Sequence, residues 1–370
     1  MPISSQPIAL FTQNLEVGGA ERVMLNLATA LADLGHRVDL VLASAQGEFL
    51  NSVPANVRVI DLGVATPIRA GRALQAYYRK ENPLITISAL NQPNVVAILA
   101  QKRSKVKAIA TIHTSLSQEA KNANSLRLRI MPYIVKALYA KADALVAVSE
   151  GVAQDACEFL GMDRSKIRLI FNPIVSPESL KRAAEPATHP WLTQKSGPVV
   201  VAAGRLMPPK DFALLLSAFS KLPKSLNARL IIFGEGDLRT ELTQQIASLG
   251  LQESISLPGF SKNVLAEISK ADLFVLSSKW EGLPSVLIEA LGCGVPVVST
   301  DCKSGPREIL QGGKFGPLVP VGDADQLAKA IERQLSPDPI RATSESWEPF
   351  TFAAAAQQYL DLVEECLARK

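Results

Sequence analysis

Two glutamates, Glu281 and Glu289, stand eight residues apart within the segment Trp280–Asp301 and are the side chains best placed to do chemistry. Between them the sequence predicts a helix that begins at Pro284, because proline is favoured at the first helical position. Leu283 precedes it and is a poor N-cap, so the first amides of the helix lack a side-chain acceptor. A helix start of this kind is suited to bind phosphate.

The spacing of the two carboxylates fits a nucleotide sugar. A phosphate at the amide of Ser285 would leave Glu281 beside the group attached to that phosphate. Glu289 lies roughly 8 Å further along the helix, at 1.5 Å per residue, which is about the reach from a diphosphate to a ribose. An ordinary βαβ unit, in which the next strand is Val295–Ser299, explains the fold of this stretch. It does not explain the Trp-Glu-Gly-Leu-Pro loop or a carboxylate on an apolar helix.

The segment resembles the donor site of retaining, nucleotide-sugar-dependent glycosyltransferases of the GT-B fold, whose two-glutamate motif has the same spacing. The resemblance implies an α/β chain with two Rossmann-like, parallel-sheet domains that face each other across a cleft. It implies that Glu281 binds hydroxyls of the transferred sugar and that Glu289 binds the ribose. It also implies that the donor contacts the intervening loop and helix start, which are Gly282, Leu283, Pro284 and Ser285.

Two cations follow the predicted strand Val199–Ala203, in Gly204-Arg-Leu-Met-Pro-Pro-Lys210. Arginine offers a planar fork to phosphate and lysine a mobile point charge. Taken alone, the pair is better explained as solvated cations of a surface loop. Two observations favour a role in catalysis instead. The cations follow a strand, and the segment 204–210 resembles the family's Gly-Arg-Leu…Lys segment. Arg205 and Lys210 would then stabilise the charge on the departing β-phosphate.

Further donor contacts rest on the resemblance. Gly18 and Gly19 lead into a predicted helix, Ala20–Leu34, and paired glycines allow close approach and unusual dihedral angles; a tight strand–helix turn is the alternative. The resemblance places this loop over the donor phosphates or between donor and acceptor, with Glu21 against the acceptor. It assigns the turn of Gly234 and Gly236 to the nucleotide pocket. The backbone at Leu257–Phe260 would contact the base, so we predict Phe260 as a donor-binding residue.

His113 ends the predicted strand Ala108–His113. A lone histidine is more often structural than catalytic, but this one matches the histidine that lines the sugar pocket in relatives. We therefore expect it to contact the transferred sugar, without acting as a general base. Asp323-Ala-Asp325 could suggest a metal site, yet it directly precedes a helical pattern, so a helix cap is the better interpretation. We predict no metal and no cofactor other than the donor.

The 370 residues, 47% of them hydrophobic, suffice for two domain cores. Alternating strands and helices predict a parallel α/β architecture. We predict an N-terminal acceptor-side domain over residues 1–175, a donor-binding domain over 176–349, a linker in the polar stretch Asn172–Pro198, and a helix in 350–370 that packs back on the first domain. The other predicted strands are Ile8–Thr12, Val38–Ala43, Val57–Leu62, Ile85–Ala89, Ala144–Val148, Arg168–Phe171, Arg229–Phe233, Ser254–Leu257 and Leu273–Leu276.

The remaining composition points to a cytoplasmic protein. The four cysteines form no CxxC pair, and no apolar run is long enough to span a bilayer. We expect no cleaved secretion signal, because the first residues lack a basic region followed by an apolar run. A net charge of +4 does not indicate nucleic acid. Nine Lys or Arg residues stand against one acid between Gln101 and Lys141. The part Lys121–Lys141 is either a packed helix pair with solvated cations or a surface that docks on anionic lipid at the inner face of the plasma membrane.

These features together with the resemblance predict a transferase, and the resemblance implies that it is a retaining one. It would move a hexose or N-acetylhexosamine from a nucleoside diphosphate, expected to be UDP, to a hydroxyl of a glycan or lipid-linked saccharide. Two other classes remain open, because a fold does not fix the chemistry. One is a sugar-nucleotide epimerase or a phosphorylase of the same fold, although no pyridoxal-binding lysine is identified. The other is a non-catalytic nucleotide-binding subunit.

Overall fold

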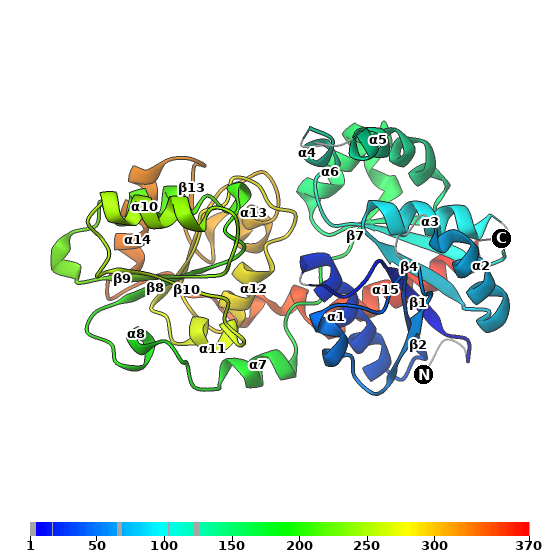
Figure 1. Cartoon of the computed structure of the whole chain (residues 1–370), viewed down its shortest axis with the longest axis horizontal. Helices are drawn as coiled ribbons and strands as arrows, with labels where there is room; N and C mark the ends of the chain where they lie inside the picture. Colours follow the sequence, from blue (N-terminus) through cyan, green and yellow to red (C-terminus); the bar gives the residue numbers. More distant parts are fainter. Residues whose placement is uncertain (1–4, 17, 65–68, 103, 122–125, 370) are drawn as a thin grey trace. The chain divides into compact units, whose positions relative to one another are not determined.

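The computed structural model describes residues 5–16, 18–64, 69–102, 104–121 and 126–369, without the side chains of 126–128. The chain divides into two compact units, residues 1–174 with 350–370, and residues 175–349. We call them the N-unit and the C-unit (Figure 1). The division falls one residue from the predicted boundary at 175, and each unit is built around one parallel sheet.

The N-unit has a seven-stranded sheet in the order β3-β2-β1-β4-β5-β6-β7. Its strands are β1 (Ile8–Thr12), β2 (Val38–Leu42), β3 (Val57–Asp61), β4 (Ile85–Ala89), β5 (Lys107–Ile112), β6 (Ala144–Ala147) and β7 (Ile167–Leu169). Its helices are α1 (Gly19–Asp33), α2 (Ala70–Glu81), α3 (Asn91–Gln101), α4 (Leu116–Lys121), α5 (Leu126–Leu138), α6 (Glu150–Leu160) and α15 (Phe352–Ala368).

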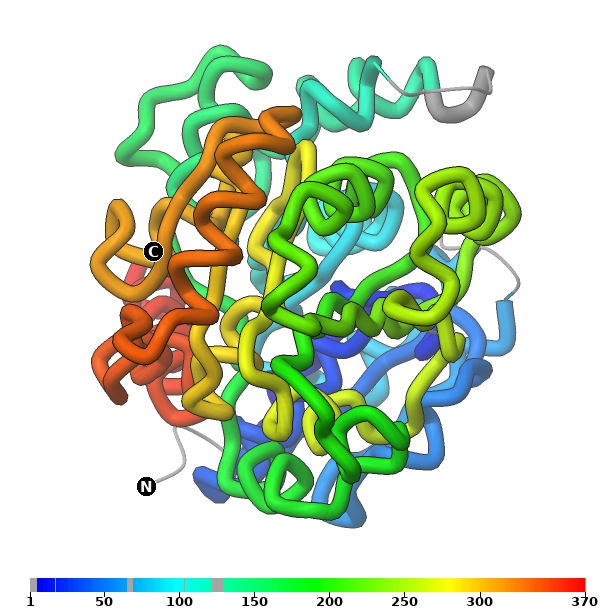
Figure 2. Tube along the Cα trace, turned by 90° about the vertical axis from the view of Figure 1, so that its left-hand side faces the viewer, coloured from blue at the N-terminus to red at the C-terminus, as the bar shows by residue number. Residues whose placement is uncertain are grey.

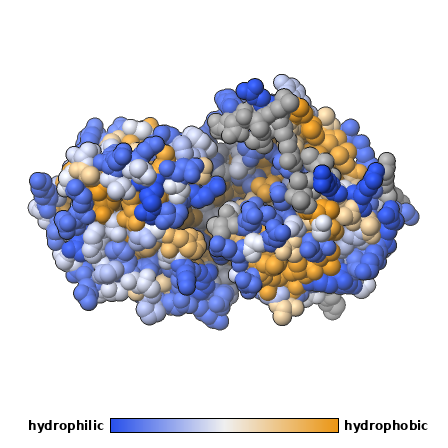
Figure 3. All heavy atoms as spheres, viewed as in Figure 1, coloured by the Kyte–Doolittle hydropathy of each residue, from blue (hydrophilic) through white to orange (hydrophobic). Residues whose placement is uncertain are grey.

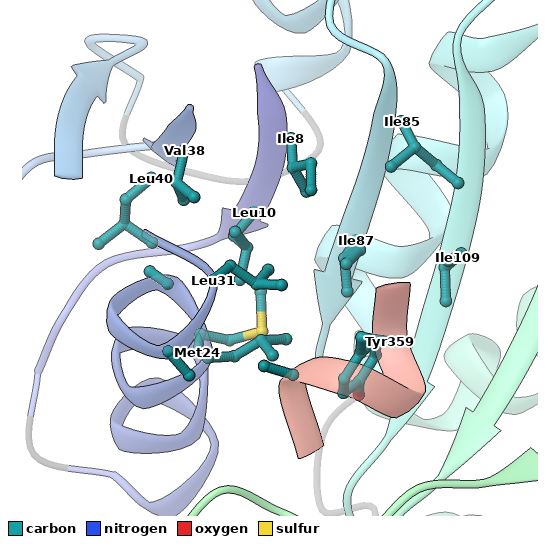
Figure 4. Close-up of a cluster of buried hydrophobic side chains, with 14 of the residues drawn as sticks. Ile8, Leu10, Met24, Leu31, Val38, Leu40, Ile85, Ile87, Ile109 and Tyr359 are labelled. Atoms are coloured by element: carbon teal, nitrogen blue, oxygen red, sulfur yellow. The ribbon is translucent and has the colours of Figure 1, made fainter. Parts of the chain in front are cut away.

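The central strands of the N-unit are buried along their whole length, as parallel strands covered on both faces must be. Successive side chains along each strand point to opposite faces of the sheet, and each face packs into its own hydrophobic core. One core joins Leu10 and Ile87 to Met24 of α1 and Tyr359 of α15 (Figure 4). The other packs α2 and α3 against the opposite face. The C-terminal helix α15 is therefore a core element of the N-unit.

The C-unit repeats this plan with a six-stranded sheet in the order β10-β9-β8-β11-β12-β13. Its strands are β8 (Val199–Ala203), β9 (Arg229–Phe233), β10 (Ile255–Gly259), β11 (Leu273–Leu276), β12 (Val297–Thr300) and β13 (Leu318–Val319). Its helices are α7 (Pro177–Ala183), α8 (Pro190–Thr193), α9 (Phe212–Phe219), α10 (Arg239–Ser248), α11 (Val264–Ser269), α12 (Ser285–Gly292), α13 (Pro306–Ile309) and α14 (Ala324–Gln334).

Helices α9, α10 and α14 cover one face of this sheet and form its main core (Figures 1 and 2). Helices α11 and α12 lie on the opposite face. Short 3-10 helices complete the chain, at Glu48–Ser52, Tyr139–Lys141, Arg164–Lys166, Pro208–Lys210, Lys224–Leu226, Gln311–Gly313, Ser344–Ser346 and Glu348–Phe350. The predicted fold class, two parallel-sheet α/β domains, is confirmed.

The interpretation of Asn172–Pro198 as the linker was wrong for most of this stretch. It contains α7 and α8 and belongs to the C-unit from Val175 on. Helix α7 begins at a capping box in which Ser176 and Ser179 bond each other's backbone amides, with Pro177 at the first helical position. The sequence signal was present, but the N3 residue of the box, Ser179, is serine instead of the more familiar glutamate.

Candidate functional site

The candidate site of the C-unit lies where its strand order reverses. Strands β8 and β11 are neighbours in the sheet, although 69 residues separate their ends. The loops that follow them therefore start side by side at the carboxyl edge of the sheet. In open α/β sheets this position is the usual ligand site. The β8 loop carries Gly204, Arg205 and Lys210, and the β11 loop carries Glu281 and leads into α12.

An ion pair joins the two loops. The ammonium of Lys210 lies 2.6 Å from Oε1 of Glu281, and the hydroxyl of Ser278 donates to the same oxygen at 2.6 Å. Only 22% of the Lys210 side chain and 12% of the Glu281 side chain are exposed. Lys210 and Glu281 are 71 positions apart in the sequence, yet their side chains form an ion pair that is mostly shielded from solvent.

Backbone contacts hold the ion pair in place. The hydroxyl of Ser277 donates to the Lys210 carbonyl at 2.8 Å, and the amide of Lys279 donates to the Pro209 carbonyl at 2.8 Å. Thr300, at the end of β12, donates to the Ser278 carbonyl at 2.7 Å. These bonds tie three strand ends together, so the carboxylate and the ammonium rest on a rigid frame. The sequence analysis did not identify Ser278 or Thr300.

The start of α12 differs by one residue from the prediction. Pro284 is the N-cap and not the first helical residue, since it has an extended conformation with φ −71° and ψ 94°. No side chain caps this helix start, as expected from the absence of a capping residue type there. Glu289 now lies roughly 6 Å along the axis from Ser285, at 1.5 Å per residue, and its side chain is partly buried.

A neighbouring loop closes against this helix start. A Cβ atom added to Gly305 would lie 2.4 Å from Cδ of Pro284, so the 301–305 loop can only approach because residue 305 is a glycine. Cys302 of this loop is buried, and burial raises the pKa of its thiol to about 12, with the charge of Glu281 acting in the same direction. The thiol is therefore uncharged at neutral pH and is not a nucleophile.

Gly234 and Gly236 allow two backbone segments to touch. A Cβ atom at Gly234 would lie 2.0 Å from the Gly204 carbonyl oxygen, and one at Gly236 would lie 2.5 Å from that of Leu206. Both glycines have φ in the range that other residues avoid, 136° and 156°. These contacts give both glycines a structural role beside the β8 loop, and their part in the nucleotide pocket stays a prediction.

Two other predicted residues are accessible at the same edge. Arg205 is exposed and lies on the β8 loop, five residues from Lys210. Phe260 follows β10, is 66% exposed, and borders a cavity of about 480 Å³ together with Phe233, Pro258 and His189. An exposed aromatic ring beside a cavity is suited to contact a flat ligand group.

The N-unit holds the remaining predicted residues. Gly18 is the N-cap of α1 with φ −154°, and the structure gives Gly19 no positive φ either, so the expectation of unusual dihedral angles was wrong. A Cβ atom at Gly18 would lie 2.0 Å from Oε2 of Glu21, the end of a flexible side chain that could turn aside at little cost. The carboxylate of Glu21 thus folds back over the start of its own helix.

His113 follows β5 and is held by the strand that carries it. Its Nε2 lies 2.8 Å from the hydroxyl of Thr111, which donates its own proton to the Ser88 carbonyl. Nε2 must therefore carry the proton, and Nδ1 is left as an acceptor. Burial lowers the pKa of His113 to about 4, so the ring is neutral at pH 7. A neutral ring with one open acceptor can bind a hydroxyl.

The possible metal motif is a helix cap. Asp323 is the N-cap of α14 and accepts a hydrogen bond from the Gln326 amide at 2.9 Å. Within the described ranges, no three His, Cys, Asp or Glu side chains are grouped so that they could hold a metal ion. Nor does any described helix combine the length and the hydrophobicity needed to cross a bilayer.

Comparisons with known proteins agree with this architecture. The family model described as glycosyl transferases group 1 matches residues 187–346, and the model described as glycosyltransferase family 4 matches residues 17–176. A Campylobacter jejuni protein named N-acetylgalactosamine-N,N'-diacetylbacillosaminyl-diphospho-undecaprenol 4-alpha-N-acetylgalactosaminyltransferase is 30% identical over 91% of this chain and 92% of its own length.

Two solved structures share the fold of the whole chain. The crystal structure of HepE from Anabaena in complex with UDP and glucose has a TM-score of 0.77 and 20% identity, and the match covers 97% of this chain and 100% of that one. Sucrose-phosphate synthase from Thermosynechococcus elongatus has a TM-score of 0.80 and 21% identity over 99% of this chain and 100% of its own.

Proposed function

Because the chain belongs to the group 1 glycosyl transferases and is a glycosyltransferase with the GT-B fold, we propose that it transfers a sugar with retention from UDP to a hydroxyl group. The sugar is a hexose or an N-acetylhexosamine. The acceptor is a glycan or a lipid-linked saccharide. The Lys210–Glu281 ion pair beside the uncapped start of α12 is the observation that supports this proposal most strongly.

Both partners of the ion pair can form further hydrogen bonds. An ammonium has three N–H donors, and one suffices for Glu281, so the others can turn to a diphosphate. Glu281 uses Oε1 for both Lys210 and Ser278, and Oε2 has no recorded bond among the described residues. In our proposal Oε2 accepts hydroxyl protons of the transferred sugar. The positive charge opposite the diphosphate comes from Lys210, Arg205 and the α12 start, and no metal ion takes part.

The proposed reaction needs no covalent intermediate. The bond between the anomeric carbon and the β-phosphate oxygen breaks, and the acceptor oxygen forms its bond on the same face. The acceptor proton passes to the leaving diphosphate, which acts as the base. Lys210 and Arg205 stabilise the charge that builds on that phosphate. We do not propose Glu281 and Glu289 as a glycosidase pair, because Glu281 lies on the loop before α12 and is assigned to the sugar, whereas Glu289 lies inside α12 and is assigned to the ribose.

Other residues would position the donor. Glu289 accepts the ribose hydroxyls, and the Leu257–Phe260 backbone meets the base, whose ring can lie against Phe260 beside the cavity of the C-unit. His113 uses Nδ1 to accept a hydroxyl of the transferred sugar. The Gly18–Gly19 turn approaches the phosphates. UDP is the proposed nucleotide because the Anabaena structure of the same fold contains UDP and glucose.

A lipid-linked acceptor is proposed from the Campylobacter jejuni relative, whose name specifies a diphospho-undecaprenol substrate. Helix α5 has the surface that such an acceptor requires. Met131 and Val135 turn inwards, whereas Arg129, Tyr133 and Lys136 are exposed, Tyr133 by 77%. Figure 3 shows hydrophobic patches on the N-unit, whereas hydrophilic side chains cover most of the visible face of the C-unit. We propose that α5 lies on the inner face of the plasma membrane, with its cations on anionic headgroups.

The docking of α5 can be tested with vesicles. Replacing Arg127, Arg129 and Lys136 with glutamate should abolish cosedimentation with anionic phosphatidylglycerol vesicles, because each basic residue near such a surface contributes about 1 kcal/mol. The Arg127 side chain lies outside the described residues. The same substitutions at Lys221, Lys224 and Lys270 of the C-unit provide the matched control. If the α5 variant sediments as the wild type does, the membrane surface is excluded.

Product analysis tests the function itself. The purified chain is incubated with a panel of UDP- and GDP-sugars, with and without undecaprenyl-diphosphate-linked saccharides, and the products are resolved by mass spectrometry and NMR. Our proposal predicts acceptor-dependent release of UDP and a product that keeps the anomeric configuration of the donor. An epimerase would convert the donor sugar without any acceptor. A non-catalytic nucleotide-binding subunit would bind UDP and release none from the donor.

A further inference from the structure

A second cavity lies in the N-unit, at the corresponding place in its own sheet. The strand order of this sheet reverses between β1 and β4. Gln13 follows β1, Leu90 and Asn91 follow β4, and all three line a cavity of about 370 Å³. Open α/β sheets bind ligands at this point. The cavity is therefore placed as the Lys210–Glu281 site is in the C-unit, although none of its residues belongs to the donor site described above.

One wall of the cavity is apolar. It is formed by α4, α5 and the start of α3, with the side chains of Leu116, Met131, Pro132, Val135 and Pro93. Apart from Pro132, which is partly buried, these side chains are buried, so their surface is preformed. A ligand that fills the cavity must present a small apolar group to this wall.

The opposite side of the cavity is a polar network anchored in the core. The buried Tyr139 hydroxyl accepts from Nδ2 of Asn94 at 3.0 Å and donates to Oδ1 of Asn91 at 2.5 Å. This bond turns Nδ2 of Asn91 towards Oε2 of Glu119, to which it donates. The Thr114 hydroxyl donates to Oε1 of the same carboxylate. The carboxylate of Glu119 is thus fixed in orientation at the cavity.

Glu119 still has acceptor capacity. An ionised carboxylate has about four acceptor sites, and the recorded bonds use one on each oxygen. Among the described residues no cation pairs with Glu119. Partial loss of solvent raises the pKa of its carboxyl group, as does the nearby Asp155, while the bonds from Thr114 and Asn91 act in the opposite direction. Ligand hydroxyl or amide donors would stabilise this carboxylate.

The backbone at Leu90 is strained. It has φ 74° and ψ 149°, a conformation that favours glycine and is unfavourable for other residues. Leu90 is also the N-cap of α3, and no side chain caps that helix. Asn91, the first residue of α3, lines the cavity, and its amide is among the first amides of the helix, which have no partner within the helix. Backbone strain persists where the surrounding structure over-determines it.

We infer that this cavity binds the acetamido group of an N-acetylated acceptor sugar, with Glu119 as its specificity-determining residue. The acetyl methyl fits the wall of Leu116, Met131 and Val135. The acetyl carbonyl accepts from the start of α3. The acetamido N–H and a neighbouring hydroxyl donate to Glu119. The inference rests on the proposed function, which it extends by naming the acceptor class.

Ligand-observed NMR tests the inference without using the donor reaction. Saturation-transfer difference spectra are recorded on the full chain with methyl glycosides of N-acetylglucosamine, N-acetylgalactosamine, glucose and galactose. We expect the acetylated sugars to bind at least about tenfold more tightly, since the site would leave polar groups unpaired without the acetamido group. The acetyl methyl protons should receive the strongest saturation. Equal binding of all four glycosides, or of none, overturns the inference.

Variants assign the binding to this cavity. Glu119→Gln should weaken binding of the acetylated glycosides about tenfold, and Met131→Ala should reduce their preference over the plain sugars. Glu48→Gln, an exposed carboxylate of the same unit, is the control. Undiminished binding to Glu119→Gln overturns the inference. Release of UDP from the donor, measured on the same preparations, tests the proposed function separately. The comparison of the four glycosides uses the wild-type chain, so it does not depend on whether a variant folds.

Discussion

Replacement of Lys210 by methionine should slow sugar transfer by about 10²–10³-fold in kcat, the usual cost of removing one preorganised charge from a developing anion. Lys210 is the mostly buried cation of the site, and its ammonium already lies 2.6 Å from Glu281. The substitution keeps the aliphatic stem, so packing against Gly204 is retained. The effect should fall on kcat more than on the KM for the donor, since charge on the phosphate grows as the glycosidic bond breaks.

A matched control separates this effect from loss of an ordinary surface ion pair. Lys221 also pairs with a carboxylate, that of Asp325 at 2.7 Å, but both side chains are more exposed. Lys221→Met should leave kcat unchanged, as exposed pairs contribute little. Steady-state kinetics on both variants, with their melting temperatures, decide the matter. A folded Lys210→Met variant that retains wild-type kcat would remove Lys210 from the mechanism.

Replacement of Glu281 by glutamine should reduce kcat/KM by roughly 30- to 1000-fold, or about 2–4 kcal/mol. The variant loses the charged acceptor for the sugar hydroxyls. It also leaves Lys210 without its counter-charge in a site where both side chains are mostly buried. The double variant with Lys210→Met should be less impaired than the product of the two single effects, because contacting residues couple by about 0.5–3 kcal/mol.

A second variant of this residue, Glu281→Ala, distinguishes a residue that binds sugar hydroxyls from a covalent nucleophile. If Glu281 formed a glycosyl–enzyme intermediate, an external carboxylate such as formate would restore activity to a smaller variant. We expect no rescue of Glu281→Ala by formate. Kinetics with increasing formate, followed by analysis of the anomeric configuration of the product, measure this. Restored turnover in formate would contradict the assigned role and favour a double-displacement reaction.

Many strands of both sheets could be predicted from the sequence alone. The runs Ile8–Thr12, Ile85–Ala89, Val199–Ala203, Arg229–Phe233 and Leu273–Leu276 coincide with β1, β4, β8, β9 and β11. Continuous apolar runs of this length have few alternatives in an α/β chain. The two-residue strand β13 was missed, since Leu318–Val319 is too short for any periodicity. The start of α12 was predicted one residue too early in the chain, at Pro284 instead of Ser285, as helix starts carry weak local signals.

The contacts within the site depend on strand order, which local sequence does not encode. Lys210 and Glu281 could be named individually, but their ion pair exists because β8 and β11 are adjacent in the sheet. Glu119 illustrates the same limit more strongly. In the sequence it is the single acid in a basic stretch, and only the adjacency of β4 and β5 brings Asn91 to its carboxylate. Its two recorded donors, Asn91 and Thr114, come from the start of α3 and from the loop after β5.

The account depends most directly on where the diphosphate binds. A crystal structure of the chain with UDP measures this. We predict the diphosphate within hydrogen-bond distance of the Lys210 ammonium, the Arg205 guanidinium and the first amides of α12, and the ribose hydroxyls on the carboxylate of Glu289. UDP bound at another place, with Glu289 turned away from the ribose, would contradict the account.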